Sequence, residues 1–382
     1  MFPPKDENSF HTVVHVLPYM AEGGTEKHVL TLLRGFQNSY NCVLLAPKGK
    51  ILPEFLKLNI QYIEFPEIKG FFPAKIRAFK EKLAEVHRIS GIDIVHVHAA
   101  HEFVSFSRKV LPQTPIIFHL SAHQGSFLSK MINYRLSASI SKRKADLLIA
   151  VSEEEKRIIV SKGFPAERVR IVYNGYELME GDDSERIEQI KAEHGLENSL
   201  VIGNLGRIHK TKRLDLLVRA FGEVRRRVKN AKLLFIGDGP DRNRLERIVK
   251  GLHLNNDMVF LGFINRGDRV LRIFDIFVLP TSFEGCSNVL IEAMAKGLPI
   301  VATDIPSVSW MFENGVSALF FRKDNEKGLA EKILELINNR HLRTKIGENA
   351  QLCFQKYFTA RRMIDGVDEI YKFLLSKPLQ VE

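Results

Sequence analysis

Short apolar runs alternate with amphipathic stretches along the whole chain. A strand buried on both faces of a parallel sheet gives a continuous apolar run, whereas an amphipathic helix repeats apolar residues every three or four positions. The runs are TVVHVL, NCVLLA, QYIEF, DIVHVH, PIIFHL, DLLIAV and VRIVY in the first half, then LVIGNLG, KLLFIG, MVFLG, FDIFVL, PIVAT and ALFF. Their alternation with helical patterns predicts an α/β fold of parallel sheets covered by helices on both faces.

One segment near the middle of the chain, NGYELMEGDDSERIEQI, has no apolar alternation and gathers turn-forming and acidic residues. It predicts a linker between residues 175 and 185. The 382 residues also exceed the ~250 to 300 at which single cores stop growing. We therefore predict two Rossmann-like domains, residues 1–176 and 177–357, which face each other across a cleft. Ligands of such sheets bind at the carboxyl ends of the strands.

Composition narrows the class of protein. Hydrophobic residues make up 45% of the chain and charged residues 26%, as in ordinary globular proteins. The three cysteines, Cys42, Cys286 and Cys353, are widely spaced, so they indicate neither a disulfide framework nor a thiolate zinc site. The N-terminal segment lacks the basic start and apolar core of a secretion signal, and no apolar run reaches membrane-spanning length. These features predict a cytoplasmic protein.

The formal net charge is +11, and most of the basic excess lies in the first half of the chain. It is concentrated with apolar neighbours in residues 69–88 and 127–144. On a helix, one face of the first segment is apolar and consists of Phe72, Ile76, Phe79 and Leu83. Two interpretations stay open: an interfacial helix on an anionic membrane surface, or an amphipathic helix with its apolar stripe in the core. No nucleic-acid partner is expected, because no such motif occurs and acids are interleaved with the bases.

The most informative stretch is PTSFEGCSNVLIEAMAKGLP, residues 280–299. It predicts a short helix between two buried strands: Ser287 is a good N-cap, and Gly297 suits a left-handed stop. Such a helix directs unpaired backbone N–H groups and its positive dipole end at the preceding loop. We therefore expect an anion at the start of this helix.

Two glutamates, Glu284 and Glu292, flank the same helix start, where they would repel a bare phosphate. An ionised carboxylate only accepts hydrogen bonds, so it suits sugar hydroxyls, while the backbone at Ser287, Asn288 and Val289 takes phosphates. A nucleotide sugar supplies both groups. The alternative interpretation is that Glu292 is an exposed helix residue and Glu284 a charge that complements the helix dipole.

Further motifs follow one another in a set order. They are GGTEKHVLTLLRGF, DIVHVH, ADLLIAVSEEEKRIIV, VRIVYNGYE, GRIHKTK, FIGDGP, VFLGF and the 280–299 segment. Over about residues 12 to 375, this series resembles the retaining glycosyltransferases of family four, also called glycosyl transferases group 1. The resemblance implies the glycosyltransferase B fold, with a last helix in residues 358–382 that returns to the first domain. It also implies a role in cell-envelope polysaccharide or glycolipid synthesis, and a peripheral place on the inner face of the membrane.

The resemblance assigns roles to individual residues. Arg207 and Lys212 would neutralise the charge on the leaving nucleoside diphosphate. Glu284 would hold donor-sugar hydroxyls, Glu292 the ribose, and His123 would face the reacting sugar. The other donor-binding residues are Gly23, Gly24, Gly206, Gly237, Gly285, Cys286, Ser287, Asn288 and Val289, and the acceptor-side candidates are His98 and His119.

Three positions depart from the family pattern. Arg213 stands where a glycine is usual, Pro306 and Ser307 stand where a glycine pair is common, and Trp310 replaces an acidic residue. We therefore expect the loop at Arg213 and the loop at residues 306–310 to differ in shape from those of the family. Trp310 either shields the cleft or only packs.

No Asp-x-Asp pair follows a strand, so charge neutralisation falls to Arg207, Lys212 and the helix N-terminus. We predict no metal and no cofactor besides the nucleoside diphosphate sugar that serves as donor. His96 and His98 share a strand face, and with His101 they would begin a zinc site, but the sequence does not specify a third convergent ligand.

The predicted function is metal-independent, retaining transfer of a hexose from a nucleoside diphosphate sugar to a hydroxyl of a glycan or glycolipid. Two alternatives remain. A glycoside hydrolase would need two carboxylates that flank one glycosidic bond, which helical spacing disfavours. A binding protein without chemistry would share the fold, because fold alone does not decide function.

Overall fold

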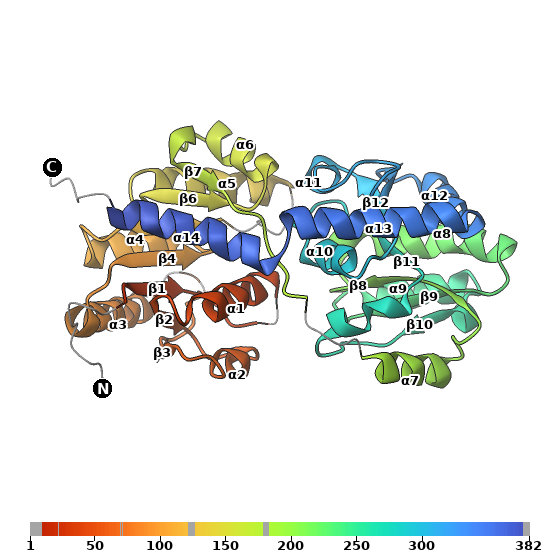
Figure 1. The fold of residues 1–382 in the computed structure, drawn as a ribbon, viewed down its shortest axis with the longest axis horizontal. Helices are drawn as coiled ribbons and strands as arrows, with labels where there is room; N and C mark the ends of the chain where they lie inside the picture. Colours follow the sequence, from red (N-terminus) through yellow and green to blue (C-terminus); the bar gives the residue numbers. More distant parts are fainter. Residues whose placement is uncertain are drawn as a thin grey trace. The chain divides into compact units, whose positions relative to one another are not determined.

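A computed structural model describes residues 10–21, 23–68, 70, 72–120, 127–178 and 183–376 (Figure 1). The chain divides into two compact units. Unit 1 contains the residues up to Gly175 together with those from Ala360 onward, and unit 2 spans Tyr176–Thr359. Each unit has its own parallel sheet and its own hydrophobic core.

Unit 1 is built on a seven-stranded sheet of order β3-β2-β1-β4-β5-β6-β7, whose strands pair in parallel. The strands are β1 (Thr12–Val16), β2 (Asn41–Ala46), β3 (Gln61–Glu64), β4 (Ile94–His98), β5 (Ile116–His119), β6 (Leu147–Ala150) and β7 (Val169–Ile171). The helices are α1 (Gly24–Phe36), α2 (Leu52–Phe55), α3 (Pro73–Ser90), α4 (His101–Val110), α5 (Phe127–Lys142), α6 (Glu153–Ser161) and α14 (Ala360–Ser376), with the 3-10 turn η1 (Ala166–Arg168).

Unit 2 is built on a six-stranded parallel sheet of order β10-β9-β8-β11-β12-β13. The strands are β8 (Leu200–Leu205), β9 (Ala231–Ile236), β10 (Met258–Phe260), β11 (Ile276–Leu279), β12 (Ile300–Asp304) and β13 (Leu319–Arg322). The α-helices are α7 (Ser184–His194), α8 (Leu214–Arg227), α9 (Arg242–Gly251), α10 (Asn288–Ala295), α11 (Pro306–Ser309), α12 (Glu326–Asn338) and α13 (Arg340–Tyr357), and the 3-10 turns are η2 (Lys210–Lys212), η3 (Asn255–Asp257) and η4 (Gly267–Ile273).

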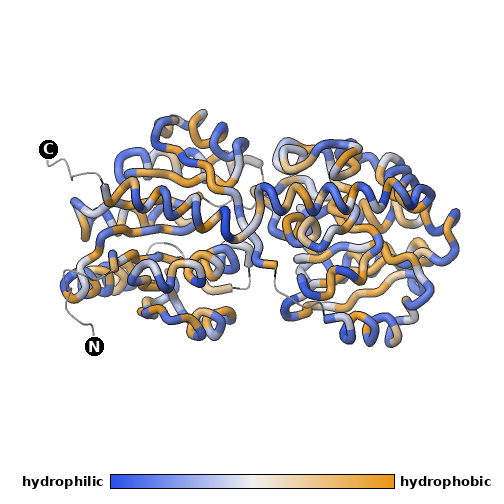
Figure 2. The backbone as a smooth tube through the Cα atoms, viewed as in Figure 1, coloured by the Kyte–Doolittle hydropathy of each residue, from blue (hydrophilic) through white to orange (hydrophobic). Residues whose placement is uncertain are grey.

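All thirteen apolar runs form strands, and the two parallel-sheet α/β units confirm the predicted fold class. The strands are buried because helices cover them, which explains why they read as continuous apolar runs. Figure 2 shows the same contrast along the backbone: the strands are mostly hydrophobic, while the helices alternate between hydrophobic and hydrophilic positions.

The chain leaves unit 1 after Gly175 and re-enters it at Ala360. The first and last segments of unit 2 lie side by side, because the Tyr176 N–H donates to the Phe358 carbonyl at 2.9 Å. In unit 1 the returning helix α14 buries Met363 and Tyr371 in the same core as α1 and one face of the sheet. The last helix is therefore part of the unit 1 core.

The apolar stripe of α3 faces the protein interior. Phe79 and Leu83 are fully buried, and Phe79 packs edge-on against Phe65 and Phe103. Of the two interpretations of this helix, the structure supports the core-facing one, which leaves only Phe72 of the stripe exposed. Across the described helices, none combines the length and the low charge that a bilayer crossing demands.

A buried carboxyl group caps the start of α6. The Glu155 N–H donates to the Ser152 hydroxyl at 3.1 Å, and the Glu155 carboxylate accepts from the Val151 N–H at 3.1 Å. The Tyr134 hydroxyl lies 3.4 Å from the other carboxylate oxygen. Burial raises the pKa of Glu155 from 4.5 to about 7. The group therefore enters the folded state most readily in its neutral form.

This predicts a pH-dependent stability that resides in Glu155. Because its folded pKa exceeds its unfolded pKa, the favourable contribution is complete below about pH 4.5 and is lost as pH rises through 7. The full shift corresponds to about 3 kcal/mol. We compare the free energy of unfolding of the Glu155→Gln variant with that of the wild type, measured by urea unfolding of unit 1. We expect the difference, variant minus wild type, to be roughly 2 to 3 kcal/mol larger at pH 8 than at pH 5.

The control is Glu153→Gln, which removes an exposed carboxylate from the same helical turn. It should change the unfolding free energy equally at both pH values. An equal effect of Glu155→Gln at pH 5 and pH 8 would contradict the assignment.

Candidate active site

The order of strands in unit 2 reverses between β8 and β11. Their backbone pairing ends at Gly203 and Phe277, and beyond it the Asn204 amide donates to the Val278 carbonyl at 2.8 Å. At such a reversal the loops that follow the two strands lead away from each other, and the crevice outside the carboxyl ends is where ligands of this fold bind. The residues that follow β8 and β11 are therefore the first to consider.

A single carbonyl ties these two loops together. The Thr211 carbonyl, in η2, accepts from the Ser282 N–H at 2.8 Å, the Ser282 hydroxyl at 3.0 Å and the Thr281 hydroxyl at 3.1 Å. Thr281 is fully buried, and its hydroxyl also lies 3.0 Å from the Phe283 carbonyl. The loop after β11 is thus held against the loop after β8.

This arrangement brings two predicted catalytic residues into contact. Nζ of Lys212 lies 2.5 Å from Oε1 of Glu284, and the two side chains are 23% and 12% exposed. Arg207, which follows β8 directly, is exposed and makes no ion pair within the described part of the chain. Two cations and a carboxylate therefore lie in the loops that follow β8 and β11, and the exposed Arg207 guanidinium is available to a ligand.

Ser307 holds the backbone of Glu284, although the family resemblance places a glycine there. The Ser307 hydroxyl accepts from the Glu284 N–H at 3.2 Å. The Ser307 carbonyl accepts from Nε1 of Trp310 at 3.2 Å, and the indole packs against Phe358 with ring centres 5.9 Å apart. The departures at Ser307 and Trp310 thus serve to fix the glutamate loop and to pack the half-buried indole.

The helix α10 begins at Asn288, after Ser287, and the chain turns at Gly297 with φ of 68°. Ser287 is 3% exposed, yet its hydroxyl makes no capping bond and has no hydrogen-bond partner among the described residues. Ser287 is therefore the N-cap residue, as predicted, but its side chain does not make the capping hydrogen bond. The buried Ser287 hydroxyl and the start of α10 can therefore bind an anion. The half-exposed Gly285 and Cys286 precede them in the same loop.

Glu292 lies in the second turn of α10 and is 5% exposed, so it is not an exposed helix residue. Tyr176 lies close enough to feel its charge: burial, then Asp268, and to a smaller extent Glu292 raise the pKa of the phenol. The Tyr176 hydroxyl donates to Asp268 at 2.8 Å. The two glutamates thus occupy different elements, with Glu284 in the loop and Glu292 on the helix.

Two predicted glycines let the ends of β8 and β9 approach each other. Gly237 has φ of 131°, and a Cβ there would lie 2.0 Å from the Gly206 carbonyl oxygen. Gly206 itself has φ of 141°. Residues with a side chain rarely adopt these backbone angles, so both positions require glycine.

Arg213 keeps the backbone shape that a glycine would give. Its φ is 49° and its ψ 39°, a left-handed conformation that costs a residue with a side chain about 1 to 2 kcal/mol. The side chain is held by Asp215, at 3.3 Å, and by Asp324. These ion pairs anchor the residue at the start of α8.

The predicted site residues of unit 1 do not form a comparable open site among the described residues. Gly23 precedes the first residue of α1, Gly24, and a Cβ on Gly23 would lie 2.6 Å from a carboxylate oxygen of Glu26. His98 and His119 end β4 and β5 and are buried, so neither ring is open to an acceptor in this conformation. His123 lies outside the described residues.

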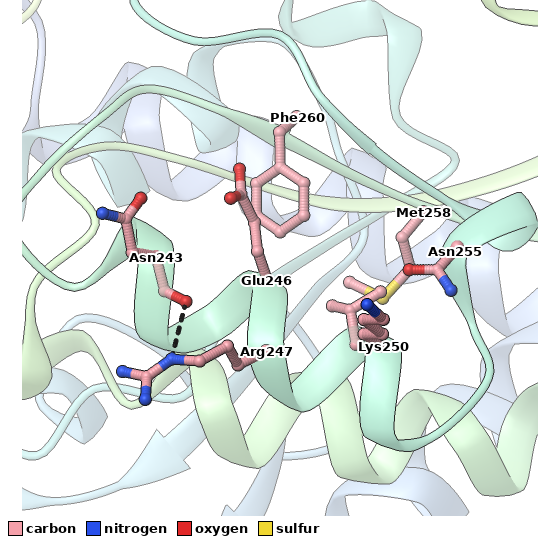
Figure 3. A pocket seen from close by; sticks show the side chains of 8 residues that line it. Asn243, Glu246, Arg247, Lys250, Asn255, Met258 and Phe260 are labelled. Atoms are coloured by element: carbon pink, nitrogen blue, oxygen red, sulfur yellow. Dashed lines mark hydrogen bonds between the residues drawn. The ribbon is translucent and has the colours of Figure 1, made fainter.

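A cavity of about 510 Å³ lies elsewhere in unit 2, beside α9 and the edge strand β10 (Figure 3). Its lining includes Glu246, Lys250, Met258 and Phe260, none of which was predicted as a site residue. The Arg247 guanidinium in its wall already donates to the Asn243 carbonyl at 3.3 Å. The cavity borders the outermost strand rather than the reversal between β8 and β11, so we do not assign the active site to it.

Comparison with known proteins decides the family. The sequence model of "Glycosyltransferase Family 4" matches residues 22–180, and that of "Glycosyl transferases group 1" matches residues 186–352. The chain belongs to the group 1 glycosyltransferases of family four. This confirms the resemblance seen in the ordered motifs.

Relatives agree with this assignment, and a solved structure shares the fold. N-acetyl-alpha-D-glucosaminyl L-malate synthase of Bacillus anthracis is 26% identical over 320 residues, which cover 78% of this chain and 80% of that protein. A Campylobacter jejuni N-acetylgalactosaminyltransferase that acts on a diphospho-undecaprenol sugar is 26% identical over 342 residues, 85% of this chain and 89% of that protein. The crystal structure of Anabaena HepE with UDP and glucose has a TM-score of 0.83 at 19% identity, over 94% of this chain and 99% of that one.

Sequence reasoning missed the residues that support the site. The Thr211 carbonyl acts through the backbone, which leaves no trace in residue type. Asn204, inside a strand, does carry a signal, because a buried amide in an apolar run needs a partner. Ser307 was noticed only as a departure from a pattern.

We predict that Ser307→Ala weakens donor binding by this glycosyltransferase. Removal of one hydrogen bond from the Glu284 N–H costs about 1 kcal/mol, or roughly fivefold in donor dissociation constant. Calorimetric titration with the nucleotide sugar measures it. Ser309→Ala is the control, because within the described part of the chain that hydroxyl bonds only the carbonyl of Ile305, the residue before its own helix. Equal affinities of the Ser307 variant and the wild type would contradict the role.

Proposed function

We propose that this glycosyltransferase moves a hexose from a nucleoside diphosphate sugar to a hydroxyl acceptor, with retention of anomeric configuration and without a metal ion. The contact between Lys212 and Glu284 at the reversal of strand order carries this proposal. A cation for phosphate and a carboxylate for sugar hydroxyls stand side by side, which matches the junction between the diphosphate and the sugar of such a donor.

The diphosphate occupies the start of α10 in this proposal. There the backbone N–H groups and the unpartnered hydroxyl of Ser287 donate to phosphate oxygens. Arg207 and Lys212 supply the positive charge from the loop after β8. Glu284, which precedes the helix start in sequence, accepts hydrogen bonds from the sugar hydroxyls. Glu292, which follows the helix start, accepts hydrogen bonds from the ribose hydroxyls.

Catalysis follows from where charge develops. As the glycosidic bond breaks, negative charge grows on the diphosphate, and cations placed there stabilise the transition state more than the ground state. The acceptor hydroxyl attacks on the face from which the diphosphate departs, and the departing phosphate takes the acceptor proton. No protein nucleophile is needed, so the configuration is retained without a glycosyl-enzyme intermediate.

The proposed donor class is the UDP-sugars. The support is the likeness in fold to Anabaena HepE, which was crystallised with UDP and with UDP-glucose. The proposed acceptor is a glycan or a glycolipid in polysaccharide or glycolipid synthesis. The Campylobacter relative acts on a lipid-linked diphosphate sugar, which supports the glycolipid half of this proposal.

We expect Arg207→Ala to lower kcat by about 100-fold or more, the usual cost of removing one transition-state donor. The assay follows release of the nucleoside diphosphate from a panel of UDP-, GDP- and ADP-sugars in the presence of acceptor. Arg219→Ala, an exposed arginine on α8, is the matched control and should leave kcat unchanged. An unaltered velocity in the Arg207 variant would overturn the proposed site.

The same assay tests the finer claims. Excess EDTA should leave turnover intact, and proton NMR of the first product should show the anomeric configuration of the donor. Loss of turnover in EDTA that a divalent cation restores, while circular dichroism shows the protein still folded, would refute metal independence of the reaction. An inverted product would refute retention.

A membrane surface is the proposed setting, and α5 is the element that supports it. Its outer face exposes Ile132 and Leu136, at 50% and 46%, beside the exposed Arg135. Lys142 and Arg143, also exposed, follow at its end. Apolar residues among bases on a helix face favour anionic lipid interfaces.

We expect the double variant Ile132→Ser, Leu136→Ser to reduce binding to anionic vesicles tenfold or more, since about half of each side chain is left to bury and full burial of an aliphatic side chain contributes about 1.5 to 3 kcal/mol. Flotation with phosphatidylglycerol vesicles measures it. Leu352→Ser removes an equally exposed leucine from unit 2 and serves as control. Wild-type flotation that is indifferent to anionic lipid would eliminate the membrane setting.

A further inference from the structure

Among the residues that the structure describes, five buried histidines gather in unit 1, whereas the residues proposed to bind the phosphates belong to unit 2. They are His15 on β1, His28 on α1, His96 and His98 on β4, and His119 on β5. The strand residues lie on one face of the sheet, because His15 pairs in register with His96 and His98 with His119. The helices α1 and α14, which pack on each other, cover this face (Figure 1).

A chain of hydrogen bonds engages part of this cluster. The Tyr371 hydroxyl, from α14, lies 2.6 Å from Nδ1 of His96 and 3.4 Å from Nε2 of His15. Nε2 of His96 lies 3.2 Å from Nδ1 of His119. Nδ1 of His15 lies 3.2 Å from Nε2 of His98. Both ring nitrogens of His15 and of His96 are therefore engaged within the cluster.

The remaining nitrogens have a different status. Nε2 of His119 is buried and has no hydrogen-bond partner among the described residues, and the same holds for both ring nitrogens of His28. Burial lowers the pKa of His28, and the Asn174 side chain opposes this by raising it. Each such buried, unsatisfied atom costs about 1 to 3 kcal/mol. A ligand that accepts their lone pairs would remove this cost.

His28, His98 and His119 each bring one ring nitrogen to within 4.8 Å of the other two. A tetrahedral zinc site has Zn–N distances of about 2.0 to 2.1 Å and therefore N–N distances of about 3.4 Å. The T-shaped packing of His28 on His119, with ring centres 4.5 Å apart, shows that the rings already converge at different angles. An inward movement of the order of 1 Å completes the geometry.

We propose that His28, His98 and His119 bind a zinc-like divalent cation. Three imidazoles with a fourth position open to water or a small ligand are a known zinc donor set. His96 and His15 hold the second nitrogens of His119 and His98, as outer partners of metal-ligating histidines do. All three rings are buried, which favours the neutral form that coordinates a metal ion.

A second group of three, His15, His96 and His98, is also close enough to share a cation. We reject it because both nitrogens of His15 and of His96 are already hydrogen-bonded within the cluster. His101, which the sequence placed beside the strand histidines, is not part of either group, and its ring bonds the Ser137 hydroxyl at 2.9 Å. The third ligand comes instead from α1, far away in sequence.

The cation would tie α1 to the carboxyl ends of β4 and β5 within unit 1. The charged residues proposed for the donor, Arg207, Lys212 and Glu284, belong to unit 2. The metal therefore stabilises unit 1 and is not required for donor binding. Metal binding and sugar transfer are separate properties that separate measurements can test.

The experiment uses the full-length protein without a tag, stripped with chelator and titrated with Co²⁺, whose visible bands are intense only in four-coordinate sites. We expect one equivalent to bind with such bands, Zn²⁺ to displace it, and thermal unfolding to shift upward. UDP-sugar should still protect the stripped protein against unfolding. A wild type that shows no four-coordinate bands overturns the proposal whether or not any variant folds.

Variants assign the ligands. His28→Leu and His119→Leu should each weaken Co²⁺ binding by more than 100-fold, whereas His15→Gln, an outer partner, should weaken it about 10- to 100-fold. His101→Gln is the matched control and should bind like the wild type. Full binding in His28→Leu combined with none in His15→Gln would assign the rejected group and refute the proposed one.

Discussion

The reversal of strand order between β8 and β11 is the constraint on which the site of unit 2 depends. Neighbouring parallel strands whose following loops lead away from each other leave a crevice at their carboxyl ends. The backbone pairing of β8 and β11 stops at Gly203 and Phe277, and beyond it the Asn204 amide joins the two strands through the Val278 carbonyl. Without a further connection the two loops would not hold a common ligand.

The Thr211 carbonyl supplies this connection and explains why Lys212 and Glu284 meet. Three donors from Thr281 and Ser282 converge on it, and the adjacent residues are carried into contact. A half-buried ion pair contributes little to stability, because desolvation offsets most of its attraction. Its value here is positional: each charge stands where one part of a nucleotide sugar needs it.

Local departures from the family pattern are compensated by nearby contacts. Arg213 takes a strained left-handed backbone but is held by two aspartates. Ser307 replaces a glycine and in return bonds the Glu284 backbone, while Trp310 packs on Phe358. Such pairing of a broken local rule with a specific contact is common at functional sites. In unit 1, Tyr371 plays a similar part, because the returning helix α14 brings a hydroxyl to rings from β1 and β4.

By itself, the sequence determined every strand of both sheets, because a strand buried in a parallel sheet appears as a continuous apolar run. It also determined the helix after Glu284 and, through the order of the motifs, the family. Tertiary structure decided which side chains share a space. The contact of Lys212 with Glu284 spans 72 positions, and the bond between Tyr371 and His96 spans 275. Periodicity reports only a residue's face on its own element. The meeting of His28 with His98 and His119 depends on how α1 packs on the sheet, which no local pattern encodes.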